Sequence, residues 1–300
     1  MLLISSTRFQ EHTTPPGHPE RPERAEVFDE IAKAFGEQGG RVIEPRAATR
    51  EELLRVHDEA YVASIEAVDG RAAMLDPDTF TSPESVQVAL LAAGAAVQAA
   101  EHALDSGEPA FALVRPPGHH AERDKAMGFC LFNNVAVAAA AALARGLERV
   151  AVVDIDVHHG NGTQWMFYDT PRVFYMSTHQ FPFYPGTGAA TEVGTGEGRG
   201  FTLNIPLPAG ARDADYELAY HDIAEAIERY APQLLLVSAG YDAHLDDPLA
   251  SMRVSTDGYA MIVGILQRAA RNVGCPIALV TEGGYDLDAL RACLKATIHL

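Results

Sequence analysis

The sequence has few cysteines, and the three that it contains are far apart. Cys130, Cys275 and Cys293 form no Cys-x-x-Cys pair. This spacing excludes a disulfide-stapled scaffold and a structural zinc knuckle, because both need paired cysteines. Scattered thiols are typical of proteins in a reducing compartment, so we expect a cytoplasmic location.

Long apolar runs are also missing. No stretch approaches the ~18 uninterrupted apolar residues of a membrane span, and the apolar start at residues 1–4 is too short for a secretory signal. We therefore expect neither export nor insertion into a membrane.

Positive charge is scarce. The chain has 23 Lys and Arg residues against 41 Asp and Glu residues, which gives a formal net charge of -18. Such a balance repels nucleic acid phosphates and anionic lipid headgroups, and it tolerates a cationic substrate. We expect no direct binding to nucleic acid or to a membrane surface.

The remaining composition predicts an α/β protein. With 300 residues, of which 47% are hydrophobic, the chain can bury one large core, and we find no linker or repeat that would divide residues 1–300. Short β-type runs alternate with helical stretches, which is typical of parallel strands joined by crossover helices. The predicted strands are 110–114, 150–154, 173–177, 234–238 and 277–280, and the predicted helices are 24–35, 84–104, 134–144, 214–230, 256–271 and 287–299.

Two long segments rich in Gly and Pro, 13–22 and 181–200, are predicted to be loops. Loops of this length inside a compact domain are usually functional. The second contains glycines at 194, 196, 198 and 200, but a β-type stretch at 201–205 follows them instead of a helix, so we reject a dinucleotide-binding loop.

Polar clusters follow the predicted strands. Arg-Pro-Pro-Gly-His-His comes after Val114, Asp-Ile-Asp-Val-His-His after Val153, Ala-Gly-Tyr-Asp after Ser238 and Thr-Glu-Gly-Gly-Tyr after Val280. In an open parallel sheet, ligands bind at the carboxyl ends of the strands, so these clusters are expected to converge on one site.

The run Asp154-x-Asp156-x-His158 indicates a metal site. Alternate residues of an extended chain point to the same side, which would align these three side chains. A carboxylate and an imidazole from this run, completed by Asp242, would give a three-ligand set with one open position. That composition is typical of catalytic rather than structural zinc.

Two further residue types have the chemistry of amide hydrolysis. The pair His119-His120 follows a rigid Pro-Pro-Gly corner, and an imidazole beside a metal can take a proton from water and return it to a leaving amine. Tyr285 follows Gly283-Gly284, a turn from which its phenol can reach a developing oxyanion. Cys130 suggests a thiol hydrolase only weakly, because a thiol mechanism leaves the Asp/His run unexplained.

These residues resemble those of the histone deacetylases and the bacterial acetylpolyamine amidohydrolases. The matching segments lie in the order expected of the family and span nearly the whole chain. They are His-Pro-Glu-Arg-Pro from His18, Arg-Pro-Pro-Gly-His-His-Ala from Arg115, Gly-Phe-Cys-Leu-Phe-Asn-Asn from Gly128, Asp-Ile-Asp-Val-His-His-Gly-Asn-Gly from Asp154, Tyr-Pro-Gly-Thr-Gly from Tyr184, Ala-Gly-Tyr-Asp-Ala-His from Ala239 and Glu-Gly-Gly-Tyr from Glu282.

The resemblance implies an arginase/deacetylase-like three-layer fold with a central, mostly parallel, twisted sheet. It implies a catalytic Zn²⁺, with Fe²⁺ as an alternative, bound by Asp156, His158 and Asp242. It also implies roles for the remaining site residues. These are His120 as general base and acid, His119 as its electrostatic partner oriented by Asp154, Tyr285 as carbonyl polariser, and Gly128, Phe129 and Tyr184 as walls of the acyl-lysine channel.

Structural K⁺ ions are implied as well. One would be bound by Asp154, Asp156, His158, Ser177 and Thr178, and a second by Phe167, Thr170, Val173 and Phe201. Arg24 matches an arginine that lines an internal acetate channel. Asn161 stands where class I members have Asp, which makes the chain class II-like and leaves His120 with a neutral partner.

The predicted substrates are acyl-lysine side chains of peptides or proteins, with N-acetylpolyamines as the alternative. Polyamine-selective relatives place a glutamate at the channel mouth, where this chain has Leu249, and an apolar rim favours acyl-lysine. A ureohydrolase with two manganese ions and a non-catalytic binding module are weaker alternatives. The first lacks its Asp-x-His-x-Asp pattern, and the second gives no reason for the ligand set, the His pair and the Tyr to occur together. The sequence leaves the oligomeric state open.

Overall fold

The computed structural model describes residues 1–299. Its main sheet has eight strands in the order β2-β1-β5-β10-β9-β6-β7-β8, and all pairings between them are parallel. The bounds are β1 Leu2–Ile4, β2 Arg41–Ile43, β5 Ala110–Ala112, β6 Val150–Asp154, β7 Val173–Gln180, β8 Thr202–Leu207, β9 Leu234–Ala239 and β10 Ile277–Thr281. A separate antiparallel hairpin joins β3 (Ala73–Asp76) to β4 (Thr79–Thr81).

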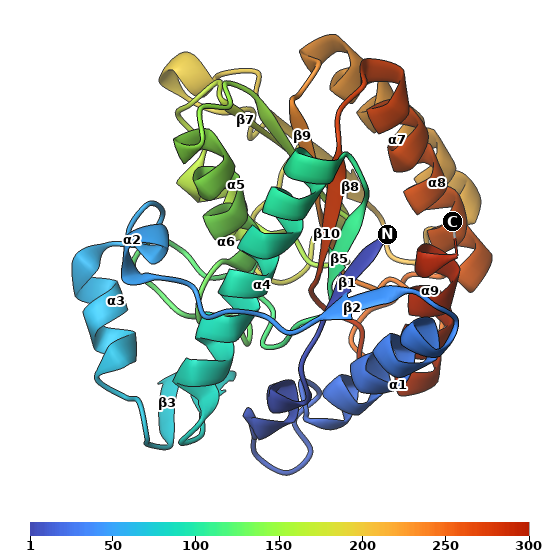
Figure 1. Cartoon of the computed structure of the whole chain (residues 1–300). Coiled ribbons are helices and arrows are strands. Elements are labelled where there is room, and N and C mark those ends of the chain that lie inside the picture. The colour runs from blue at the N-terminus through green and yellow to red at the C-terminus, as the bar shows by residue number, and fades with distance from the viewer. Residues whose placement is uncertain (300) are drawn as a thin grey trace.

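Helices cover both faces of the sheet and produce three layers (Figure 1). Helices α4 and α5 lie on one face, and α1, α7, α8 and α9 lie on the other. The helices are α1 Glu23–Glu37, α2 Arg50–Leu53, α3 Glu59–Glu66, α4 Ser85–Ser106, α5 Asn134–Ala144, α6 Asn161–Met166, α7 Asp213–Tyr230, α8 Thr256–Val273 and α9 Leu287–Ile298, with short 3₁₀ turns at Thr7–Glu11 and Gly196–Gly198.

The central strands are buried on both faces, so alternate residues enter different cores. In β10, Ala278 and Val280 pack into the core beneath α4 and α5, whereas Ile277 and Leu279 pack into the core beneath α7 and α8. This explains why the strands have nearly continuous apolar sequences rather than an apolar/polar alternation.

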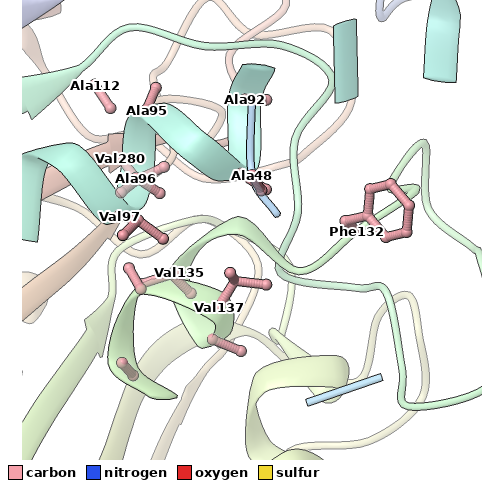
Figure 2. Close-up of a cluster of buried hydrophobic side chains, with 14 of the residues drawn as sticks. Ala48, Ala92, Ala95, Ala96, Val97, Ala112, Phe132, Val135, Val137 and Val280 are labelled. Atoms are coloured by element: carbon pink, nitrogen blue, oxygen red, sulfur yellow. The ribbon is translucent and has the colours of Figure 1, made fainter. Parts of the chain in front are cut away.

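The alanine-rich helix α4 packs closely against its neighbours because its side chains are small. Figure 2 shows Ala92, Ala95, Ala96 and Val97 of α4 beside the side chains of α5 and β10. At Gly94 a Cβ atom would lie 1.9 Å from the Arg46 carbonyl oxygen, so this approach requires glycine. The helix ends at Gly107, whose φ of 73° is the left-handed conformation that favours glycine.

The predicted α/β class and all the strands and helices predicted from the pattern are confirmed, with bounds that shift by a few residues. The β-type stretch after the glycine run is strand β8. The sequence pattern missed β1, β2, α2, α3, α6 and the β3–β4 hairpin. These elements are short, and three to eight residues contain too few periods for an apolar pattern to emerge.

Both segments that the sequence predicts to be loops are confirmed as loops. Residues 13–22 contain no helix or strand, and residues 181–200 contain only the 3₁₀ turn at Gly196–Gly198. Within residues 1–299, no helix is both long and apolar enough to cross a membrane.

Candidate active site

The polar clusters meet at the carboxyl edge of the sheet, as the sequence predicts. Strands β10, β9 and β6 are neighbours in the sheet, and their last residues are Thr281, Ala239 and Asp154. The segments that follow them therefore begin side by side. The His119-His120 segment, which follows β5, joins them from the other side of β10.

Asp156, His158 and Asp242 form the one group of three metal-ligand side chains found among the described residues. One donor atom from each lies within 4.8 Å of the others, and all three residues are buried. The His158 Nδ1 atom lies 3.1 Å from Asp156 Oδ1 and 3.0 Å from Asp242 Oδ2. Two oxygen donors and one nitrogen donor thus face a common point, the composition of a catalytic zinc site.

The chain brings these ligands together by the predicted alternation, although strand β6 itself ends at Asp154. The two intervening apolar residues pack into the core beneath α7 and α8, whereas Asp156 and His158 enter the ligand group. Asp154 points to the same side but contacts His119, whose ring lies 3.0 Å from Asp154 Oδ2 and 3.9 Å from Asp156 Oδ1. Asp154 Oδ1 also accepts a hydrogen bond from the Asp156 backbone nitrogen, and Asp156 Oδ1 accepts one from the His158 nitrogen, because short acidic side chains bond their own backbone two residues ahead.

Two glycines leave space for the ligand carboxylates. A Cβ atom on Gly240 would lie 2.0 Å from Asp156 Oδ2, and one on Gly283 would lie 2.3 Å from Asp242 Oδ2. The backbone nitrogen of Gly283 also donates a hydrogen bond of 2.8 Å to Asp156 Oδ2. Any larger residue at either position would displace a ligand.

The charges of the ligand group favour a bound cation. Burial alone lowers the pKa of His158, but hydrogen bonds with Asp156 and Asp242 outweigh it and raise the pKa to about 10. Burial and repulsion from Asp156 raise the pKa of Asp242 to about 7. Two buried carboxylates at this distance repel each other, and a divalent cation between them would offset both the repulsion and the burial.

Each histidine of the pair has its own partner. His119 Nδ1 lies 3.0 Å from Asp154 Oδ2, and His120 Nδ1 lies 2.7 Å from Asn161 Oδ1. The two rings are adjacent, with centroids 4.0 Å apart.

The amide of Asn161 fixes the tautomer of His120. Its Nδ2 donates to Glu122 Oε1 at 2.6 Å, so its Oδ1 is the atom that faces His120. An amide oxygen only accepts, and His120 Nδ1 must therefore carry a proton. In the neutral ring this leaves Nε2 as a proton acceptor.

The surroundings shift the two imidazoles in opposite directions. Burial lowers the pKa of His119, but the Asp154 and Asp156 carboxylates outweigh it and hold the pKa well above the usual range. Burial, together with the neighbouring His119 and His158, holds the pKa of His120 well below the usual range. Titratable neighbours whose pKa values diverge are typical of acid–base sites.

Tyr285 is held at the same site by its backbone and its ring. Its nitrogen donates to Asp247 Oδ2 at 2.7 Å, and its ring lies 5.1 Å from the Arg24 guanidinium and edge-on to Phe129 at 5.8 Å. Gly284, with a φ of 120°, makes the turn that precedes it. Burial and the Asp242 charge keep the pKa of Tyr285 well above its usual range, so the phenol retains its proton and can donate.

A cavity of about 200 Å³ leads to these groups. Aromatic rings form much of its wall, and both His120 and His158 are among its lining residues. The lining residues are Asp78, His120, Gly128, Phe129, His158, Phe183, Tyr184, Leu249 and Tyr285. A cavity lined by aromatic rings and by a few polar side chains suits a ligand that has an apolar part next to a polar group.

Comparison with known proteins agrees with this geometry. The family model for the histone deacetylase domain matches residues 18–300. The chain belongs to the histone deacetylase family. It is therefore an amidohydrolase of the deacetylase type, and this family generally depends on a metal.

Relatives from different organisms match this deacetylase over most of its length. A probable deacetylase of Archaeoglobus fulgidus is 40% identical over 292 residues, covering 95% of this chain and 81% of the relative. A histone deacetylase-like amidohydrolase of Pseudomonas aeruginosa is 43% identical over 260 residues, covering 84% and 68%. The solved HDA15 HD domain superimposes with a TM-score of 0.93 at 36% identity, covering 99% of this chain and 88% of that one, which confirms the deacetylase fold.

The two K⁺ sites stay predictions. Asp154 of β6 is in register with Ser177 of β7, and both are buried next to Thr178. The second set surrounds the turn before β7. Here the Thr170 nitrogen donates to the Phe167 carbonyl oxygen at 3.4 Å, Val173 begins β7, and the Phe201 carbonyl oxygen accepts from the Tyr175 nitrogen at 3.1 Å.

Arg24 of the deacetylase is fully buried, and its guanidinium makes three hydrogen bonds within the protein. Nη1 donates to Glu20 Oε1 at 3.1 Å, Nε to the Gly284 carbonyl oxygen at 2.8 Å and Nη2 to the Glu282 carbonyl oxygen at 2.5 Å. Arg24 therefore supports the turn that carries Tyr285. Its predicted role in an acetate channel stays a prediction.

Sequence analysis missed three acidic residues that shape the deacetylase site. Asp78 lines the channel, and Glu282 accepts hydrogen bonds from the backbone nitrogens of Gly118 and His119 at 2.6 and 3.1 Å. Asp247 accepts from the nitrogens of Tyr285 and Leu249 at 2.7 and 3.0 Å. Glu282 and Asp247 lie in or next to the recognised motifs, so their position in the sequence could have indicated a role at the site. No motif lies near Asp78 in the sequence.

Cys130 is fully buried, and its sulfur donates to the Gly128 carbonyl oxygen at 3.2 Å. Burial, followed by the nearby Glu282 charge, raises the pKa of this thiol well above its usual range. A thiol that stays protonated is a poor nucleophile, so the structure agrees with the rejection of a cysteine hydrolase.

Proposed function

We propose that this chain is a zinc-dependent deacylase that removes acetyl or other acyl groups from lysine side chains. One observation supports this above all others. The ligand group Asp156, His158 and Asp242, the His119-His120 pair and Tyr285 meet at a single cavity, which His120, His158 and Tyr285 line. Amide hydrolysis needs a polarised carbonyl, an activated water and a protonated leaving amine, and these groups supply each of them.

The ligand group suits Zn²⁺, and it also suits Fe²⁺, because two carboxylates and one imidazole with an open position are compatible with both. When bound there, such a cation polarises the amide carbonyl and lowers the pKa of water. We further propose K⁺ at Asp154, Asp156, His158, Ser177 and Thr178, and at the turn formed by Phe167, Thr170, Val173 and Phe201.

The protein's own groups would divide the proton chemistry between them. His120 Nε2 takes a proton from the attacking water and then passes it to the leaving nitrogen. His119, kept protonated by Asp154, holds positive charge beside the growing negative charge. Tyr285 donates a hydrogen bond to the carbonyl oxygen, and Asn161 keeps the His120 ring in the required tautomer.

The channel supports acyl-lysine as the substrate class. Phe129, Tyr184 and Gly128 line the cavity. We assign Phe129 and Tyr184 as walls for an aliphatic chain and the Gly128 carbonyl oxygen as the acceptor for the substrate amide. Leu249 lies at the lining, where a glutamate would be needed to pair with a distant ammonium. N-acetylpolyamines remain the alternative, since the chain is strongly acidic.

The cytoplasmic location and the single catalytic domain at 1–300 also stay predictions.

An activity panel on metal-defined protein tests the proposal. Acyl-lysine peptides, acetylputrescine, acetylspermidine and arginine should be offered to zinc-loaded and iron-loaded enzyme. Hydrolysis of at least one acyl-lysine peptide with kcat/KM above that for the acetylpolyamines is expected. Preferred hydrolysis of arginine would instead indicate a ureohydrolase. A higher kcat/KM for an acetylpolyamine than for every acyl-lysine peptide would show that acetylpolyamines are the preferred substrates.

A further inference from the structure

One wall of the substrate channel has an unfavourable backbone conformation. Phe129, whose ring lines the channel, has a φ of 70°. For a residue with a side chain, this left-handed region is less favourable than ordinary backbone. Other parts of the protein must therefore hold the Gly128–Phe129 segment in place.

The β3–β4 hairpin holds this segment by its backbone. Asp78 Oδ1 accepts a hydrogen bond of 3.1 Å from the Gly128 nitrogen, and Thr79 Oγ1 accepts one of 3.0 Å from the Phe129 nitrogen. Thr79 is buried, and its hydroxyl donates to Asp78 Oδ1 at 2.9 Å. The turn of the hairpin is thus directly bonded to the channel wall.

His18 connects this turn to the proline-rich loop 13–22. Its Nδ1 lies 2.8 Å from the Glu20 carbonyl oxygen and its Nε2 lies 3.1 Å from the Asp78 carbonyl oxygen. Carbonyl oxygens only accept, so the ring is the donor in each of these bonds. The same ring packs edge-on against Phe129, with centroids 4.7 Å apart, and against Phe80 at 5.7 Å.

We propose that His18 is a positioning residue for deacylation, a clamp that ties loop 13–22 to the β3–β4 turn and thereby fixes Phe129 as the channel wall. His18 does not touch the ligand group or the His pair, so it acts on how the substrate chain is held rather than on bond breaking. The kinetic part of this inference rests on the proposed function.

His18→Phe tests the clamp, because it keeps an aromatic ring and removes both hydrogen bonds. Its KM for an acyl-lysine peptide is expected to rise about tenfold while kcat stays within about twofold. In a Phe129→Ala background the wall is already lost, so adding His18→Phe should leave KM nearly unchanged. Met74→Ala, an exposed position on the same hairpin, serves as the matched control and should behave like wild type.

Hydrogen exchange gives a readout that needs no activity. Exchange in segment 126–132 is expected to be at least tenfold faster in His18→Phe than in wild type and unchanged in Met74→Ala. If His18→Phe fails to fold, His18→Gln, which has one donor nitrogen in place of two on opposite sides of a ring, should show the same changes to a smaller degree.

Three results would overturn the proposal. These are an equal KM increase in the Phe129→Ala background, a fall in kcat at constant KM, and unaltered exchange at 126–132. Nitrogen NMR that finds one ring nitrogen of His18 unprotonated would also exclude the two-carbonyl clamp. Absence of all acyl-lysine turnover in wild type would instead refute the proposed function, while the exchange experiment would still decide about the clamp.

Discussion

Replacement of Glu20 by Gln should destabilise the protein severely without changing its shape. The Glu20 carboxylate is fully buried and accepts two hydrogen bonds of 2.7 Å from Arg115 and one of 3.1 Å from Arg24. His12 Nε2 lies 3.3 Å from it. Gln has nearly the same volume, so the substitution removes the negative charge and leaves two buried guanidiniums without it.

The expected loss follows from the cost of a buried, unpaired charge. Breaking a buried ion pair by removing one partner typically costs about 3–5 kcal/mol. For a chain of this size that corresponds to a fall in Tm of about 10 °C. Urea unfolding and calorimetry at pH 7 would measure the loss. Glu225→Gln, in a pair whose two side chains are each 71% exposed, is the matched control and should change Tm very little.

The pH dependence provides a second check on the same residue. Burial alone would raise the pKa of Glu20, but Arg115 and His12 outweigh it and hold the pKa well below 4.5. A lowered carboxyl pKa means that the stabilisation is present above about pH 4.5 and is lost as pH falls toward the folded-state value. The stability difference between wild type and Glu20→Gln should therefore be constant near neutrality and shrink in acid. Equal stabilities at pH 7, or a difference that grows in acid, would refute this reasoning.

Other predictions concern the site itself. Asp242→Ala should abolish both metal content and activity, whereas elemental analysis of wild type should find one transition metal per chain; two tightly bound metals would contradict the single ligand group. Tyr285→Phe should retain its metal and stability and lose about two to three orders of magnitude in kcat, the effect of a lost oxyanion donor; a fully active variant would remove Tyr285 from the chemistry. Leu249→Glu should shift the ratio of kcat/KM values toward acetylpolyamines, and an unchanged ratio would show that this position does not select the substrate.

Much of this molecule could be predicted from its sequence because its strands and long helices repeat the same physical pattern. The strand Val150–Asp154 is apolar at every position but the last, since both of its faces are buried, and its end was predicted to the residue. The family motifs indicated the site residues. Because the sheet is parallel, the segments that follow its strands meet at one edge. The ligand group, the His pair and Tyr285 were all identified in this way.

The remaining features depend on contacts between residues distant in the sequence, which no local pattern records. Asp78 reaches the channel because a short hairpin packs against residues 128–129, fifty positions away along the chain. Asp242 joins His158 because strands β9 and β6 are neighbours in the sheet, although the two residues are 84 positions apart along the chain. Apolar periodicity and motif spacing, which the sequence determined, act over a few residues. The hydrogen bonds that orient the channel wall connect segments that only the folded chain brings together, and the tertiary structure alone decided them.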